Sequence, residues 1–351
     1  YGDKHIVAFN YDGLLRVSSV METIEGRNYT AFYTYDGAGR EEFLTYPSGI
    51  TVQKQYSNSG YHRSVIDPAD GAVLWRSNEA DAMGYITDYQ LGNGLATQRS
   101  YDKESNFLKG IFTTKDGQVY QDLTYDFDAF GNLRNRADHI GPAKSESFEY
   151  DEFNRLVDIR LNNRQTGSMA YDIYGNIRSK TIDNQDVYYD AEYNGNCPYA
   201  VSKVKTDKTD LNGINQNIEY TVFDKMSRVV SGGNTLSIDY GYDYGRLHSV
   251  EVVGGMRKEK VYVKDCEFVN EGGKSRVYTY LKGPLGVFAV CTSEGKGDNV
   301  ISYIHKDHQN SWCLITDAVG NIQQIMSYDA WGNPRSSSTW TGNYNGGLLF
   351  L

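Results

Sequence analysis

The sequence predicts an all-β fold made of repeated β-hairpins. An aromatic–Asp pair, followed about four residues later by Gly, Asn or Arg and then by an aliphatic residue, recurs about ten times at spacings of about 20 residues. The segments between copies alternate and are rich in β-forming residues, and no segment has a helical apolar stripe. Tyr accounts for 30 of the 351 residues, which suits a sheet that buries aromatic rings while their hydroxyls stay hydrogen-bonded. A fixed period of this kind indicates one supersecondary unit stacked many times.

Each residue of the repeat has a physical role in a hairpin. The Asp carboxylate can accept hydrogen bonds from backbone N–H groups two residues further on, and Gly or Asn at the fourth or fifth place tolerates a positive φ. About twenty residues accommodate two strands of about seven to eight residues and two short turns, so one repeat corresponds to one hairpin. We assign the structural repeat motif to Tyr11, Asp12, Tyr35, Asp36, Gly131, Tyr150, Asp151, Tyr171, Asp172, Gly175, Phe223, Asp224, Tyr242, Asp243, Tyr328, Asp329 and Gly332.

The domain organisation predicted from this pattern is a single array. The repeats run from near residue 11 to near residue 333 without a Pro- or Ser-rich linker, so residues 1–351 are interpreted as one continuous unit. The chain opens at Tyr1 without Met and stops within the apolar run 348–351. We expect it to be a fragment of a longer chain, in which case the lack of a signal peptide carries no information about export.

Composition argues against several classes of partner and site. The net charge of −10 and the scattered Lys and Arg residues disfavour nucleic acid, and no run of about eighteen apolar residues could span a membrane. The cysteines lack the paired spacing of a structural zinc site and are expected to be buried free thiols, although Cys266 and Cys291 could face each other across strands. The four cysteines are Cys197, Cys266, Cys291 and Cys313.

Two clusters invite an enzymatic interpretation, and neither is favoured. His305 and His308 flank Asp307, but residues three apart on a strand point to opposite faces, which is poor metal-ligand geometry. Asp126 and Asp128 would share one face of a strand, but Asp128 occupies the turn position of the repeat. No Gly-x-Ser-x-Gly elbow, phosphate loop or His-Glu-x-x-His motif is present. The sequence therefore predicts no catalytic residue, no metal site and no cofactor.

The repeats resemble a known family. An aromatic–Asp pair followed by Gly and Asn or Arg is the signature of YD repeats, which occur in bacterial Rhs proteins, in the shell-forming component of insecticidal toxin complexes and in teneurin adhesion proteins. Residues 303–333, which include Thr316-Asp317 and Tyr328-Asp329, look like the segment that closes the Rhs core. Gln309 to Trp312 stand where the family commonly has a Gly-Ser-containing turn, which is a departure from the family pattern.

The resemblance implies a function as well as a fold. It implies a long sheet that spirals into part of a hollow β-shell, which encloses a C-terminal toxin or effector and helps to deliver it. The implied partners are that toxin cargo and flanking shell segments of the same protein. The implied location is secreted or on the bacterial cell surface, with the signal or delivery region outside this chain.

The dimensions of such a wall can be estimated from the repeat. About sixteen hairpins give about thirty-two strands, and a sheet of that width closed into one ring would be about 50 Å across. A folded domain of about 100 residues has a radius of gyration near 13 Å and would fit inside. The ring would be open at both ends, and its exposed strand edges would favour self-association with a second copy.

Two other functions stay open at the level of sequence. A Tyr-rich sheet face resembles surfaces that stack on sugars, so a cell-surface adhesion or glycan-binding module is the alternative to a shell. An exposed row of Trp75, Trp312, Trp331 and Trp340 would favour it. The chain could also be part of an enzyme whose active residues lie elsewhere.

Overall fold

The computed structural model contains strands and turns and, within the residues it describes, no helix. It describes residues 5–183, 185–194, 197–205, 216–295, 299–344 and 346–347, without the side chains of 185–186 and 188–217. None of these residues forms a helix long and apolar enough to cross a membrane. The predicted all-β class is confirmed.

The described residues form thirty-one strands, close to the number expected from the repeat. The first are β1 (His5–Tyr11), β2 (Val17–Ile24), β3 (Arg27–Tyr35), β4 (Glu41–Thr45), β5 (Thr51–Tyr56), β6 (His62–Ile66), β7 (Val73–Ala80), β8 (Ile86–Leu91), β9 (Ala96–Tyr101) and β10 (Leu108–Lys115). The next are β11 (Gln118–Phe127), β12 (Leu133–Asp138), β13 (Lys144–Tyr150), β14 (Leu156–Leu161), β15 (Arg164–Tyr171), β16 (Ile177–Ile182), β17 (Gln185–Asn194), β18 (Cys197–Lys205), β19 (Gln216–Tyr220), β20 (Met226–Ser231) and β21 (Asn234–Tyr240). The last are β22 (Arg246–Val253), β23 (Met256–Val263), β24 (Cys266–Glu271), β25 (Lys274–Gly283), β26 (Gly286–Glu294), β27 (Val300–Lys306), β28 (Trp312–Thr316), β29 (Ile322–Ile325), β30 (Ser327–Tyr328) and β31 (Pro334–Arg335).

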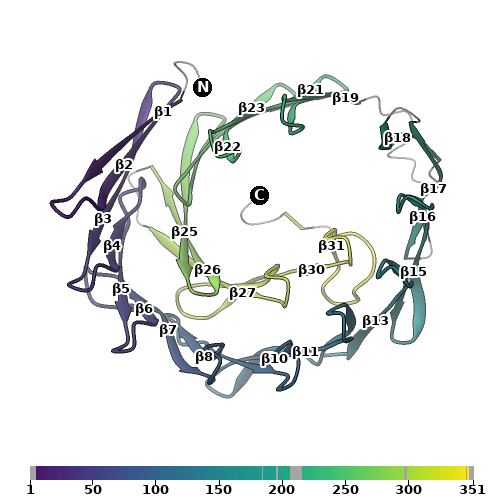
Figure 1. Ribbon diagram of the computed structural model, residues 1–351, viewed down its shortest axis with the longest axis horizontal. Helices are drawn as coiled ribbons and strands as arrows, with labels where there is room; N and C mark the ends of the chain where they lie inside the picture. The colour runs from purple at the N-terminus through teal and green to yellow at the C-terminus, as the bar shows by residue number, and fades with distance from the viewer. Residues whose placement is uncertain are drawn as a thin grey trace.

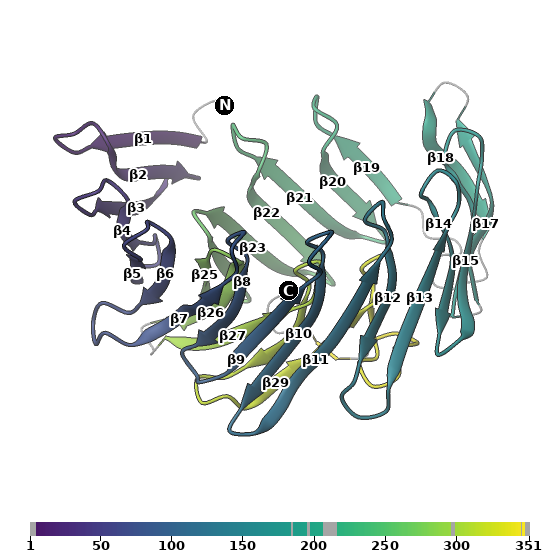
Figure 2. The ribbon, with the colours of Figure 1, turned by 60° about the horizontal axis from the view of Figure 1, so that its bottom comes forward.

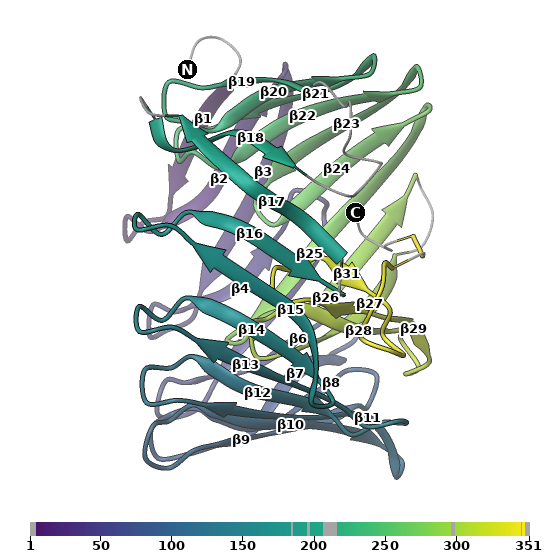
Figure 3. The same ribbon diagram turned by 90° about the vertical axis from the view of Figure 1, so that its right-hand side faces the viewer.

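The strands form two antiparallel sheets and one small hairpin. Strands β1 to β18 make an 18-stranded sheet, β19 to β29 make an 11-stranded sheet, and β30 pairs with β31. Pairing follows the order of the chain, for example β1 with β2, β2 with β3 and β27 with β28. Figures 2 and 3 show the consecutive strands lying side by side. This is the meander that a chain of hairpins produces.

The sheets follow a spiral (Figure 1). Strands β1 to β18 run round the outside, β19 to β23 continue the ring, and β25 to β27 then pass inside the first strands. The small hairpin β30–β31 lies inside the ring. The wall is therefore two layers thick where the end of the chain overlaps its beginning.

The main core lies between these two layers. One cluster of buried side chains joins strands and turns of the outer layer to β24, β25, β26 and β27 of the inner layer. Apolar faces of two sheets packed in this way remove both from water, which is the dominant stabilising term in a sheet sandwich. The cluster comprises Leu44, Tyr46, Val52, Val65, Trp75, Tyr89 and Leu91 from the outer layer and Cys266, Leu281, Phe288, Ala289 and Tyr303 from the inner layer.

The two edges of the wall carry different turns. Turns from odd-numbered to even-numbered strands in β1–β16 all lie at one edge, because the strands are antiparallel. The opposite edge includes two-residue turns in which both residues have positive φ, such as Glu25 (φ 48) with Gly26 (φ 76), and Asp116 (φ 50) with Gly117 (φ 80). Such turns match the twist of the strands that they connect.

The structure shifts two of the predicted motif positions. Phe223-Asp224 and Tyr242-Asp243 do not begin turns. In the first turn the N–H of Asp224 bonds to the carbonyl of Thr221, and Asp224 itself has a positive φ of 61. In the second turn the residue that begins the turn is Gly241. Thr221 and Gly241 therefore occupy the Asp position, since the backbone bonds of a turn, rather than the presence of an Asp, define its register.

The cysteines also differ from one expectation. Cys266 and Cys291 do not face each other, because Thr279 of β25 pairs with both and lies between them. Both are buried free thiols, and Cys313 is a free thiol of intermediate exposure. Cys197 lies outside the side chains that the structure describes.

The turn register generates a test at Gly175. Gly175 has φ +86, and a Cβ built on it has no neighbour within 4 Å, so any cost of a side chain there is conformational. We expect Gly175→Val to lower the free energy of unfolding by about 1–3 kcal/mol, measured by chemical denaturation. Gly13, in the first repeat turn, has equal space without a positive φ. Gly13→Val is the matched control. An equal loss of unfolding free energy in both variants would show that the positive φ of Gly175 is not the cause.

Candidate functional site

The repeat turn is a hydrogen-bonded unit centred on the Asp carboxylate. In the first copy the Asp12 N–H donates to the Arg16 carbonyl and the Leu15 N–H donates to the Asp12 carbonyl. Asp12 Oδ1 accepts the N–H groups of Leu14 and Arg16 at 2.8 and 3.0 Å. Asp12 Oδ2 accepts Arg16 Nε at 2.7 Å. One side chain thus satisfies two turn amides and fixes the residue four places further on.

The same arrangement recurs in other copies. Asp36 and Asp151 bind Arg40 and Arg155 in this way, with Nε–Oδ2 distances of 2.8 and 2.7 Å. Where Asn replaces Arg, its amide takes the same place. These amide contacts join Asn132 to Asp128, Asn176 to Asp172, Asn321 to Asp317 and Asn333 to Asp329.

The same hydrogen bonds keep the Asp carboxyls of these turns ionised. The Arg hydrogen bond, assisted by two backbone amides, holds the pKa of the Asp12, Asp36 and Asp151 carboxyls below its usual range. These carboxylates are therefore ionised structural acceptors, and as such they cannot serve as general acids at neutral pH.

In several copies the Tyr immediately before the turn connects one repeat to the previous one. Tyr35 Oη donates to the Val17 carbonyl at 2.8 Å, just beyond the preceding turn. The Arg of that turn stacks on the same ring, with Arg16 Cζ 4.4 Å from the centroid of Tyr35. Equivalent hydroxyl bonds are Tyr56 to Glu41, Tyr150 to Leu133, Tyr171 to Leu156 and Tyr240 to Met226. The Asp, Arg and Tyr of successive repeats form a ladder along one edge of the wall.

The sequence analysis missed this partnership between repeats. The signal was present, because Arg16, Arg40 and Arg155 all stand four residues after the motif Asp. The stacking of Arg on the next Tyr depends on strand pairing, which the sequence alone did not provide.

A second site ties the C-terminal hairpin to the outer wall. Glu146 of β13 lies between Arg136 of β12 and Arg335 of β31, and its side chain is 3% exposed. Arg335 binds it with two parallel bonds, at 2.6 and 2.8 Å, and Arg136 Nε donates to it at 2.7 Å. Trp340 packs against both guanidinium groups, with its ring centroid 5.5 and 4.9 Å from their Cζ atoms. Burial opposes ionisation of Glu146, but the bonds from Arg335 and Arg136 prevail and its pKa is lowered.

A pocket of about 350 Å³ lies beside this triad, between β11–β13 and the segment 307–340. Its lining includes Tyr125, His308, Cys313, Met326 and Trp340. The ring of His308 packs 4.5 Å from that of Tyr125, and both of its nitrogens are buried without a hydrogen-bond partner. Burial, reinforced by the charge of Arg136, lowers the pKa of His308 to about 4. His308 is therefore a neutral imidazole at neutral pH.

The groups near His308 do not form an activated nucleophile. Burial raises the pKa of the Cys313 thiol, and Cys313 Sγ donates to the carbonyl of His305. Asp307 accepts the N–H groups of Gln309 and Ser311, as other turn aspartates do, although burial raises its pKa. A thiol whose pKa is raised lacks the thiolate character that nucleophilic cysteines need.

The histidines and aspartates considered from the sequence are placed as follows. His305 is fully buried, donates or accepts a bond with Thr316 Oγ1 at 3.0 Å, and burial lowers its pKa to about 3. Asp128 accepts the turn amides of Phe130 and Asn132, while Asp126 lies in β11. Neither pair of residues is brought into a shared acid–base site.

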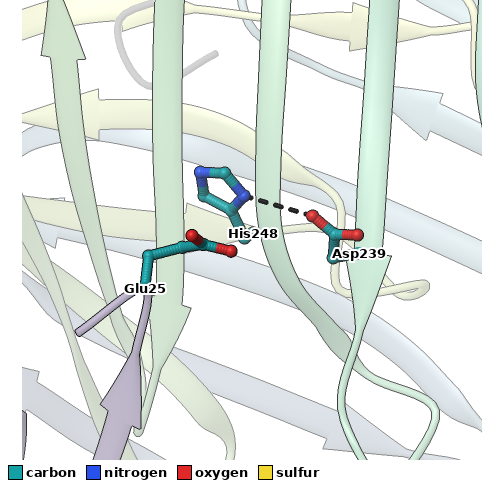
Figure 4. Close-up of side chains that lie close together, drawn as sticks. All are labelled: Glu25, Asp239 and His248. Carbon is teal, nitrogen blue, oxygen red and sulfur yellow. Dashed lines mark hydrogen bonds and ion pairs between the residues drawn. The ribbon is translucent and has the colours of Figure 1, made fainter. Parts of the chain in front are cut away.

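One group with metal-ligand chemistry does converge among the described residues. Glu25, Asp239 and His248 each offer a ligand atom within 4.8 Å of the others (Figure 4). Glu25 is more than 200 residues from the other two, so no sequence motif indicated this cluster.

The tryptophans do not form the exposed row that glycan binding would favour. Trp75 and Trp340 are buried, Trp312 is partly buried, and Trp331 is 39% exposed with Lys180 above its ring.

Comparison with known proteins identifies the fold. No protein-family model matches the chain. The tRNA3(Ser)-specific nuclease WapA of Bacillus spizizenii is 25% identical over 321 residues, which are 89% of this chain and 12% of that protein.

Three solved structures are similar over 95% of this chain and 20% of theirs, each at 16% identity. They are TcdB2–TccC3–Cdc42 with a TM-score of 0.81, TcdB2–TccC3 without its hypervariable C-terminal region with 0.79, and the Photorhabdus luminescens Tc holotoxin pore with 0.77. The chain thus spans a fifth of these structures and has the fold of that part of the Tc toxin complex.

The buried triad generates a test of how the C-terminal hairpin is held. Glu146→Gln leaves Arg136 and Arg335 buried without their anion, so we expect it to lower the free energy of unfolding by about 3–5 kcal/mol, measured by urea denaturation. Glu219→Gln, which removes an ion pair whose Glu side chain is 58% exposed, is the control and should cost less than about 1 kcal/mol. Equal effects would show that the triad adds nothing beyond a surface pair.

The buried histidine generates a test of pH dependence. The unfolded chain protonates His308 near its ordinary pKa of about 6.5, whereas the folded chain does so only near 4. Between pH 6.5 and 4 only the unfolded chain binds this proton, so His308 lowers the free energy of unfolding as the pH falls through this window. Above pH 6.5 His308 is neutral in both states and has no such effect. We expect His308→Phe, which preserves the ring packing, to reduce the slope of unfolding free energy against pH in this window by up to about 1.4 kcal/mol per pH unit. An unchanged slope would contradict the assignment.

Proposed function

We propose that this chain is a wall segment of a bacterial toxin-associated β-shell, which surrounds a toxin or effector carried C-terminal to it. The observation that carries the proposal is the spiral course of the sheet, with the hairpin β30–β31 inside the ring (Figure 1). The likeness to the Tc holotoxin pore and to TcdB2–TccC3 supports it, because those structures share the fold over nearly all of this chain. In this proposal the chain acts as a scaffold, and its partners are the cargo and flanking segments of the same protein.

The position of the C-terminal hairpin favours enclosure over display. The Arg136–Glu146–Arg335 triad fastens β31 to the inner side of the wall, and Gly342 N–H donates to Asp183 Oδ2 at 2.7 Å further along the wall. A segment that continues from this hairpin would start inside the ring. The proposal places the protein outside the bacterial cytoplasm when it acts, either secreted or on the cell surface.

The structure supports the alternative, an adhesion or glycan-binding module, less than a shell. Trp75 and Trp340 are buried and cannot stack on a sugar, and repeat tyrosines such as Tyr35 use their hydroxyl and ring within the ladder. Exposed tyrosines such as Tyr61 and Tyr174 lie in separate turns.

Protection of an appended sequence tests the enclosure. A recognition site for a specific protease is placed directly after Leu351 in one version and directly before Tyr1 in another, and the two cleavage rates are compared in the folded chain. We expect the C-terminal site to be cut at least about tenfold more slowly, because the wall limits the approach of the protease. The two rates should become equal in denaturing urea, which is the control for the intrinsic quality of each site. Equal rates in the folded chain would overturn the proposal.

A further inference from the structure

Residues from distant parts of the chain meet where the beginning of the outer layer contacts the inner layer. Glu25 lies in the turn between β2 and β3, Asp239 near the end of β21, and His248 in β22. One ligand atom from each lies within 4.8 Å of the others, and Figure 4 shows their side chains gathered at one place. Both carboxylates are exposed, whereas His248 is buried.

The imidazole of His248 is held by carboxylates on both of its nitrogens. Nε2 lies 2.9 Å from Glu259 Oε1, and Nδ1 lies 3.2 Å from Asp239 Oδ2. A carboxylate that accepts one ring N–H is the usual outer support of a metal-bound histidine, since it fixes the tautomer and turns the other nitrogen toward the metal. With Nε2–H directed at Glu259, the lone pair of Nδ1 faces Asp239. Two electron-rich atoms at that separation need either a proton on Nδ1 or a metal cation between them.

The local charge also favours a cation. Glu25, Asp239 and Glu259 bring three carboxylates to one imidazole. Arg257, whose guanidinium lies 3.5 Å from Glu259 Oε2, binds the carboxylate on the far side of the ring. The two carboxylates nearest Nδ1 therefore repel each other unless a positive charge joins them.

The turn that carries Glu25 is fixed by packing. Ile24, immediately before it, is 1% exposed and belongs to a buried cluster with Leu247, Val261 and Val263 of the inner layer. This contact sets the position of the turn against β22 and β23, so the approach of Glu25 to His248 follows from the packing of the two layers. The exposed side chain of Glu25 leaves the cluster open to ions from solvent.

We propose that Glu25, Asp239 and His248 bind a first-row divalent cation of the Zn²⁺ type, with Glu259 holding the imidazole. The donors would be Nδ1 of His248 and one oxygen from each of the two carboxylates, with water completing the coordination. One imidazole with two carboxylates suits Zn²⁺, at metal–ligand distances of about 2.0–2.2 Å. The two exposed carboxylates reach such distances by side-chain rotation. Bound there, the ion joins the first hairpin of the outer layer to the inner layer.

The competing state is a protonated His248 that forms ion pairs with Asp239 and Glu259. In that state Glu25 has no ligand role. The role of Glu25 therefore separates the two states, and the separation is independent of the proposed shell function.

Zinc titration of the intact chain tests the site. The chain is freed of metal with EDTA, exchanged into buffer, and titrated with ZnCl₂ by calorimetry, with the melting temperature measured in parallel. We expect saturable binding of one Zn²⁺ and a melting temperature that rises with zinc concentration, as for any ligand that binds only the folded state. Absence of saturable binding would overturn the proposal.

Three substitutions and one control assign the ligands. Glu25→Gln, at an exposed side chain, and His248→Gln should each abolish the 1:1 binding and the shift in melting temperature. Glu259→Gln should retain binding but weaken it about 10–100-fold, the usual effect of losing the support of a metal-bound histidine. Glu251→Gln, at an exposed position of the same strand β22, should bind as the unmodified chain does. Binding that is unchanged in Glu25→Gln would overturn the assignment.

Discussion

The structure depends on one repeated interaction, the bond between the Asp of a turn and the residue four places after it. Asp12 satisfies two turn amides and at the same time orients Arg16. Arg16 then lies against Tyr35 of the next repeat, whose hydroxyl reaches back to Val17. Each unit thus determines the position of its neighbour. A long sheet without this ladder would rely on backbone pairing alone, which leaves register weakly specified.

The repeat turn is accompanied by a local departure from regular pairing. The register shifts at the residue before the turn, as between Asn10 and Tyr11 and between Thr34 and Tyr35. A bulge of this kind increases the local twist of a strand pair. Repeated at one edge of the wall and absent from many turns at the other, it gives the two edges different geometry, which accounts for a sheet that curves into a spiral.

Much of the fold could be predicted from the sequence because it is local. The hairpin period, the turn position of Asp128 and the positive φ of Gly175 follow from short-range chemistry. Sequence reasoning failed where the pattern and the backbone disagreed: Asp224 follows an aromatic residue, yet Thr221 begins that turn. The overlap of the layers could not be predicted from the repeats. The repeats are similar in sequence, so none of them indicates which distant strand it will contact. The Arg335–Glu146 bond and the approach of Glu25 to His248 belong to this second kind of information.

The inner layer shows what replaces the ladder where the motif is missing. Between β22 and β26 the connections include tight pairs such as Gly254-Gly255 and Gly272-Gly273, and no Asp-centred turn of the repeat type occurs among the described residues of that region. Those strands hold some of the most buried side chains of the described chain, Ala289 and Val290 among them. Packing takes over the role of fixing their position, against the outer layer at Ala289 and against neighbouring inner strands at Val290, since a fully buried face tolerates neither a slip of one residue nor a void. The ladder and the layer packing thus both fix strand position, and the strands from β22 to β26 rely on the second. A polar contact such as that of Glu146 with Arg335 then fixes how the C-terminal hairpin is aligned on the outer wall, because an apolar interface alone is weakly directional.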